Sequence, residues 1–122
     1  MLFDNRSVIL GYRNIDLDFK EHLSIKDSLI FKNCNNLKIR VGSKINKIIF
    51  INCYQVVLTC SSTIAGIDIE KCNFFKLIPI YPYNLNVIDC FKTNLDLVIN
   101  NDFSFDNIKL INQDSKINLI SI

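Results

Sequence analysis

Four cysteines recur through the middle of the chain at almost constant intervals. Cys34, Cys53, Cys72 and Cys90 are separated by 19, 19 and 18 residues. Apolar residues lie five and three positions before each cysteine, and mostly three and five positions after it, so apolar and polar side chains alternate. A fixed period of about 20 residues with this alternation is typical of a β-solenoid. One such unit cannot bury its apolar row alone, but stacked units bury a continuous core.

Length and composition agree with a solenoid. The 122 residues favour one domain that spans 1–122, and a hydrophobic content of 49% can fill a core. We expect an all-β fold, because no segment of 12 residues shows the 3.6-residue period of an amphipathic helix. With only three glycines and two prolines, the tight corners should rely on asparagine, which tolerates left-handed backbone, and on aspartate, serine and lysine.

Charge and hydropathy argue against several classes of function. The net charge of +2 is too small to indicate nucleic acid or an anionic membrane as a partner. No apolar run reaches the roughly 18 residues that a membrane span requires. The first six residues also lack the apolar segment of a secretory signal. We therefore expect a cytoplasmic protein whose five cysteines are reduced.

The cysteines indicate packing rather than chemistry. There is no Cys-x-x-Cys pair and His22 is the single histidine, so we predict no metal site and no cofactor. Stacked at one corner of successive coils, the four regularly spaced cysteines would form an inward ladder, with Cys60 elsewhere in the core. No catalytic acid, base, nucleophile or phosphate loop stands out, so we expect no enzymatic activity.

Two isoleucines interrupt the polar side of the alternation. Ile49 and Ile51 fall where the next coil has Asp68 and Glu70, so they should point outward. Two interpretations stay open for this candidate interface. The isoleucines form a contact site for a partner, or a loop or the N-terminal segment covers them.

Two stretches of the chain, residues 30–39 and 42–53, resemble the C-terminal domain of cyclase-associated proteins. That family has a similar cysteine-centred strand, then a Gly-Lys-x-Asn corner, then a strand that ends in Asn-Cys. The corresponding residues here are Gly42 to Asn46 and Asn52-Cys53. Later coils of the family resemble residues 67–72, 85–87 and 106–119, so the similarity extends from about residue 8 onward.

The resemblance implies a right-handed parallel β-helix of about six short coils. It also implies binding to ADP-bound monomeric actin, promotion of nucleotide exchange on that actin, and dimers formed through this domain. Because actin is acidic, basic outward residues can steer the association. The candidate actin-binding residues are Lys38, Arg40 and Lys76 on one sheet, with Lys44 and Lys47 at the adjoining corner. The plainer interpretation of these residues is a solvated face.

Three departures from the family pattern affect these expectations. Ser43 is inserted in the Gly-Lys corner. Residues 80–83 read Ile-Tyr-Pro-Tyr where the family has a second Gly-Lys corner. The sequence ends at Ile122, about where the family continues into an exchanged hairpin that joins two copies. We therefore expect a homodimer either to be lost or to use another surface.

Two other functions compete with actin binding. Tubulin cofactor C and the retinitis pigmentosa 2 protein have a similar β-helix and can stimulate GTP hydrolysis with the arginine of a Gln-x-Arg-x-His pattern. The aligned residues here are Gln55, Val57 and Thr59, and valine cannot supply the charge of that arginine. The other alternative is an interaction or self-assembly module without actin binding, for which exposed strand edges would serve.

Overall fold

The computed structural model describes residues 7–11, 13–19, 23–80, 87–99 and 108–121, which form twelve β-strands and no helix. The strands are β1 (Ser7–Leu10), β2 (Arg13–Asp18), β3 (Ser28–Lys32), β4 (Asn35–Val41), β5 (Lys47–Ile51), β6 (Tyr54–Cys60), β7 (Ile67–Glu70), β8 (Asn73–Pro79), β9 (Val87–Phe91), β10 (Asn94–Ile99), β11 (Lys109–Gln113) and β12 (Lys116–Ser121). All are only four to seven residues long, because the chain turns to the opposite side of the stack after each strand.

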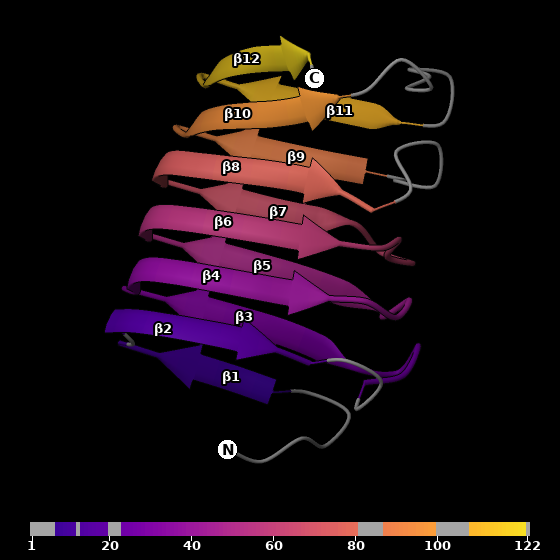
Figure 1. Ribbon diagram of the computed structural model, residues 1–122. Helices are drawn as coiled ribbons and strands as arrows, with labels where there is room; N and C mark the ends of the chain where they lie inside the picture. The colour runs from indigo at the N-terminus through magenta and orange to yellow at the C-terminus, as the bar shows by residue number, and fades with distance from the viewer. Residues whose placement is uncertain (1–6, 12, 20–22, 81–86, 100–107, 122) are drawn as a thin grey trace.

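The strands divide into two parallel six-stranded sheets. The odd sheet has the order β1-β3-β5-β7-β9-β11, and the even sheet has the order β2-β4-β6-β8-β10-β12. Each coil contributes one strand to each sheet, and the coils rise as a right-handed helix from the N-terminal to the C-terminal end (Figure 1). The predicted all-β, parallel β-helix is therefore confirmed.

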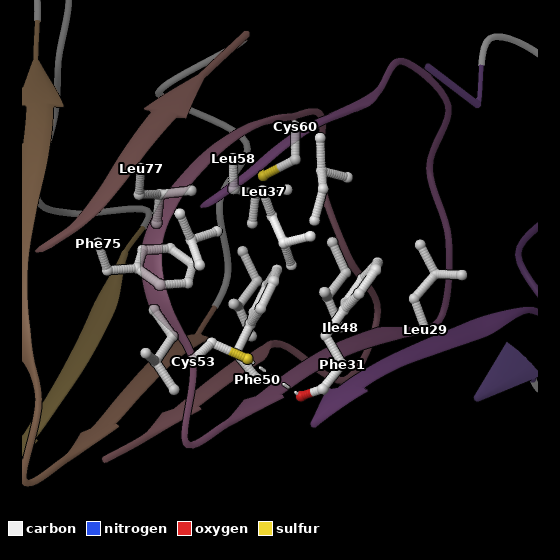
Figure 2. Close-up of a cluster of buried hydrophobic side chains, with 14 of the residues drawn as sticks. Leu29, Phe31, Leu37, Ile48, Phe50, Cys53, Leu58, Cys60, Phe75 and Leu77 are labelled. Carbon is white, nitrogen blue, oxygen red and sulfur yellow. Dashed lines mark hydrogen bonds between the residues drawn. The ribbon is translucent and has the colours of Figure 1, made fainter. Parts of the chain in front are cut away.

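The hydrophobic core fills the narrow space between the two sheets. Side chains alternate between the two faces of a strand, so every second residue of β4 from Leu37 onward is buried. Figure 2 shows inward side chains of both sheets meeting in this space. The ring of Phe50 stacks on Phe31 with 5.0 Å between centroids, and it lies edge-on to Phe75 at 4.8 Å. Inward residues of successive coils are in register, so similar contacts repeat about every 4.8 Å along the axis.

Tight corners join the odd strand of each coil to the even strand. One residue at each of five such corners has a φ angle between 48° and 56°: Asn33, Asn52, Lys71, Lys92 and Asp114. Asparagine adopts this left-handed conformation more readily than most residues. Asparagine, lysine and aspartate are all among the residue types that the sequence predicted for the corners. The Asn52 side-chain amide donates to Asn33 Oδ1 at 2.8 Å, which ties neighbouring corners together.

The predicted position of Cys90 is wrong. Cys90 lies inside β9, where it pairs with Ile69 of β7, and the position above Cys72 is taken by Thr93. The strands β5 and β7 are offset by 19 residues, whereas β7 and β9 are offset by 21, because the connection between them is longer. Equal intervals counted along the sequence therefore led to the wrong residue.

The corner ladder contains five small side chains that each carry a sulfur or a hydroxyl group: Cys34, Cys53, Cys72, Thr93 and Ser115. The N–H of Cys53 donates to Cys72 Sγ at 3.4 Å, and the N–H of Cys72 donates to Thr93 Oγ1 at 3.2 Å. The N–H of Thr93 in turn donates to Ser115 Oγ at 3.0 Å. The ladder thus satisfies backbone N–H groups that the sheets leave unpaired at the corner. Cys53 Sγ also donates to the carbonyl of Phe31 at 3.5 Å (Figure 2).

All five cysteines are free and buried, including Cys60, as predicted for a packing role. Burial raises the pKa of the Cys60 thiol to about 12. Burial, with the nearby charge of Asp89, also raises the pKa of Cys90 to about 12. Hydrogen bonding with Cys72, together with burial, raises the pKa of Cys53, whereas hydrogen bonding with Cys53, including the bond from its backbone N–H, lowers the pKa of Cys72.

Candidate functional site

Three basic side chains project from the outer face of the even sheet. Lys38 and Arg40 alternate with buried residues in β4, and Lys76 lies between buried residues in β8. All three are exposed. Lys38 and Lys76 are each in register with Val57 of the intervening strand β6, so their Cα atoms lie about 9.5 Å apart. We call Lys38, Arg40 and Lys76 the basic cluster.

Carboxylates border the basic cluster on both sides along the stack. Asp16 and Asp18 of β2 are in register with Lys38 and Arg40, and Asp96 of β10 is in register with Lys76. Asp96 Oδ1 accepts a hydrogen bond from the Asn118 amide at 3.0 Å. Among the described residues, the three cations of the cluster form no ion pair. Their positive charges are therefore available to a partner, on a face where basic and acidic side chains alternate along the stack.

The other two predicted basic residues lie elsewhere. Lys44 is exposed in the corner that leads from β4 to the odd sheet. Lys47 begins β5, and its Nζ lies 2.9 Å from Asp68 Oδ2 in an ion pair on the outer face of the odd sheet. The five predicted residues thus do not form one site, because the chain changes sheet between Arg40 and Lys47.

The two isoleucines of the candidate interface point outward from β5, as the alternation predicts. Ile49 is in register with Ile30 and Asp68, and Ile51 is in register with Lys32 and Glu70. Both isoleucines are half-buried, and their neighbour Ile30 is 7% exposed although it belongs to the same outward row. This row therefore offers a partner less apolar surface than the sequence alone suggested.

Sequence reasoning missed the two exposed aromatic residues of the even sheet. Phe74 is 68% exposed and Tyr54 is 43% exposed. Their rings meet edge-on, with 5.3 Å between centroids. A signal was present: Phe74 and Phe75 are adjacent, and in a strand only one of two neighbours can face the core. Phe75 is the buried residue of the pair.

A shallow hollow of about 420 Å³ lies between Phe74 and two residues of the basic cluster, Lys38 and Lys76. Phe74, Lys38 and Lys76 line it, together with Gln55, Val57 and Asp96. Gln55 and Phe74 both have positive φ angles, of 57° and 55°. For a bulky residue such as phenylalanine, this conformation costs of order 1–3 kcal/mol. The hollow therefore combines apolar, cationic and amide groups beside a strained residue.

The residues aligned with the GTPase-activating pattern lie on the same face. Val57 and Thr59 point outward from β6, in register with Lys38 and Arg40 of β4. Arg40 is thus the arginine next to Thr59, on the neighbouring strand.

In the described ranges, no group of three or more His, Cys, Asp or Glu side chains could hold a metal ion. The same residues include no helix that is long and apolar enough to cross a membrane.

The stack of short parallel strands in two sheets defines the class of this protein, a two-sheet β-helical domain. Residues 4–80 match the family described as adenylate cyclase associated (CAP) C terminal. The chain belongs to this family, and the resemblance noted in the sequence is confirmed. The matched segment contains the whole basic cluster and both exposed aromatic residues.

A solved structure has the same fold along almost the entire chain. The crystal structure of cyclase-associated protein from Cryptosporidium parvum superimposes with a TM-score of 0.84 at 22% sequence identity. The similarity covers 99% of this chain and 73% of that one. No curated protein matches the sequence.

Proposed function

We propose that this domain binds monomeric actin through the basic cluster. Membership of the family across residues 4–80 carries the proposal, because this segment contains Lys38, Arg40 and Lys76. These side chains are exposed and form no ion pair among the described residues, so their charge can act on an acidic partner. Complementary charges of this kind speed association and fix the orientation of the two proteins.

We further propose that the preferred partner is ADP-bound actin and that binding promotes nucleotide exchange. The preference for ADP-bound actin is relative to ATP-bound actin. A protein that starts from the ADP-bound state accelerates exchange when it binds the open, nucleotide-free state of actin more tightly still. This mechanism needs a broad, rigid contact surface and no reacting group, so the domain would act without enzymatic chemistry of its own. Its site of action would be the cytoplasm, where monomeric actin is found.

Reversing two charges of the cluster should weaken actin binding without unfolding the domain. The double substitution Lys38→Glu and Arg40→Glu is expected to lower affinity for ADP-actin at least about tenfold, because it replaces attraction by repulsion at the centre of the face. Both side chains are exposed, so the domain should stay folded, although the urea midpoint should fall modestly because the two glutamates would face Asp16 and Asp18 across the sheet. Titration of fluorescently labelled actin measures the affinity, and release of a fluorescent nucleotide measures exchange.

The matched control reverses two exposed charges on the other sheet. Lys32 ends β3 and Lys109 begins β11, and Lys32→Glu with Lys109→Glu changes the net charge by the same amount. This control should bind actin like the wild type. Equal weakening in both double variants would point to overall charge instead of the basic cluster. Wild-type protein that neither binds ADP-actin nor speeds exchange at micromolar concentration would refute the proposed function.

We propose that the chain forms a homodimer by direct contact between strand edges at the C-terminal end of the stack, and not through the exchanged hairpin that the resemblance implies. β11 and β12 are the edge strands there, and among the described strands neither has a neighbour on its outer side. Leu119 is 49% exposed although it continues the inward row of Leu97. Unpaired edges template pairing with another chain. Sedimentation equilibrium should give twice the chain mass of 14.1 kDa, and Leu119→Lys should return it to one chain. A wild-type protein that sediments as a single chain would contradict this.

A further inference from the structure

Phe74 occupies a backbone position that suits asparagine better. In β2, β4, β6 and β8, the residue just before the first inward side chain has a φ angle between 54° and 57°. These residues are Asn14, Asn36, Gln55 and Phe74, and β10 has no equivalent of them. Their flanking residues are in register from coil to coil, so these four form one row of bulges. A bulge of this kind re-aims the side chain of the additional residue. Phe74 is the one member of the row that is bulky and apolar.

The row of bulges ends at Phe74. In the next coil Asn94 is followed directly by Leu95, which is in register with Phe75, so no residue stacks on Phe74 from that side. Asn94 instead donates a side-chain hydrogen bond to Asn73 at 2.8 Å. The missing residue leaves a second hollow of about 360 Å³ beside Phe74, lined also by Asn94, Asp96, Lys116 and Asn118. Phe74 therefore stands as a ridge between two hollows, supported edge-on by Tyr54.

We propose that Phe74, supported by Tyr54, is the aromatic anchor of the actin-binding face and inserts into an apolar pocket of the partner that carboxylates surround. The inference rests on the proposed function and names the contact that supplies most of the affinity. Residues that dominate binding are typically aromatic or arginine side chains near the centre of an interface, with a polar rim around them. Phe74 has this setting, because Lys38 and Lys76 line the same hollow.

The surrounding charges favour a protein partner over a nucleic acid. A polyphosphate backbone requires a continuous positive stripe, because each phosphate contact contributes separately to binding. Here Asp96 lines both hollows, and Asp16 lies beside Lys38 in the register of the sheet. A protein surface that combines an apolar pocket with a few carboxylates fits this alternation of signs. The partner of Phe74 is thus a folded protein surface that carries both apolar and acidic groups.

The conformation of Phe74 argues against a purely structural role. The side chain is 68% exposed, so it contributes little to the core, and its backbone is in a region that phenylalanine rarely adopts. Strained residues of this kind concentrate at functional sites. If the residue serves binding, replacing it by a residue suited to the bulge should improve folding and impair function, which is the usual sign of such a trade-off.

The decisive variant is Phe74→Asn, which keeps the bulge and relieves the backbone. The urea midpoint is expected to stay the same or rise, while affinity for ADP-actin falls at least about tenfold. Phe74→Tyr retains the ring and should bind within about threefold of the wild type. The loss in Phe74→Asn should persist at high salt, because burial of an aromatic ring is not screened, whereas the loss in the Lys38→Glu, Arg40→Glu variant should shrink.

Three results would overturn the anchor. If Phe74→Asn binds like the wild type while the charge-reversed variant is weakened, the anchor is wrong and the proposed function stands. If Phe74→Asn loses affinity and stability together, the residue is structural. If the wild type does not bind ADP-actin, the proposed function fails and the anchor fails with it.

Discussion

Replacing Phe50 by alanine is expected to lower the free energy of unfolding by about 3–5 kcal/mol. The side chain is fully buried, with its ring between those of Phe31 and Phe75. Removing it leaves a cavity that adjacent coils cannot close, because sheet hydrogen bonds hold them at a fixed spacing of about 4.8 Å. Urea unfolding followed by far-ultraviolet circular dichroism measures the loss.

The matched control for this prediction is Phe74→Ala. It removes the same atoms from an exposed position one coil away, so the free energy of unfolding should fall by no more than about 1 kcal/mol, because the edge-on contact with Tyr54 is the main packing that is lost. If Phe50→Ala cost less than about 1 kcal/mol, the phenylalanine stack would not be a main source of stability. The spacing of the coils would then be more adaptable than the register indicates.

Replacing Thr93 by valine is expected to lower the free energy of unfolding by about 1–3 kcal/mol. Valine has nearly the same shape but no hydroxyl group. In the wild type, Oγ1 accepts from the N–H of Cys72, and its single hydroxyl hydrogen is shared between the carbonyls of Ile69 and Phe91, at 3.1 and 3.0 Å. Thr93 is 2% exposed, so the Cys72 N–H would lose its partner in a buried place. Urea unfolding gives the loss, and faster hydrogen exchange at the Cys72 amide would locate it.

Two further variants test the explanation. Thr93→Cys restores the heteroatom that three other coils use at this position, and it should cost less than Thr93→Val. Thr59→Val removes a hydroxyl from the outer face of β6, where Thr59 is half-buried, and it should change stability little. Equal stability of Thr93→Val and the wild type would show that the hydrogen bonds of the ladder contribute nothing net.

The sequence predicted the architecture because its period and its alternation are repeated signals. The alternation in each strand indicates which residues face the core. Because the pattern repeats, an ambiguous assignment in one coil can be checked against the next coil. Cys34, Cys53 and Cys72 therefore lie at the corner as predicted, and Lys38, Arg40 and Lys76 project from one face. The same local rule also placed Ile49 and Ile51 on the outside, although it gave no measure of their partial burial.

The candidate site was predicted only in part. Lys47 is close to Arg40 in sequence, yet it begins a strand of the opposite sheet and pairs with Asp68. Phe74 was not singled out from the sequence, although the alternation places its neighbour Phe75 on the inward side. Its exposure depends on the bulge before Phe75 and on the absence of a stacking residue in the next coil. Neither feature follows from one strand considered alone.

Alternation within each strand is a local property, so the chain by itself determined the β-helical fold, the inward rows and the outward charges. Which residues stack between coils depends on the number of residues in each connection. The offset of 21 residues between β7 and β9 places Thr93, and not Cys90, above Cys72. The tertiary structure alone therefore decided which side chains meet across coils. The physical reason is that hydrogen bonds between parallel strands align backbone positions in space, whatever length of chain connects them.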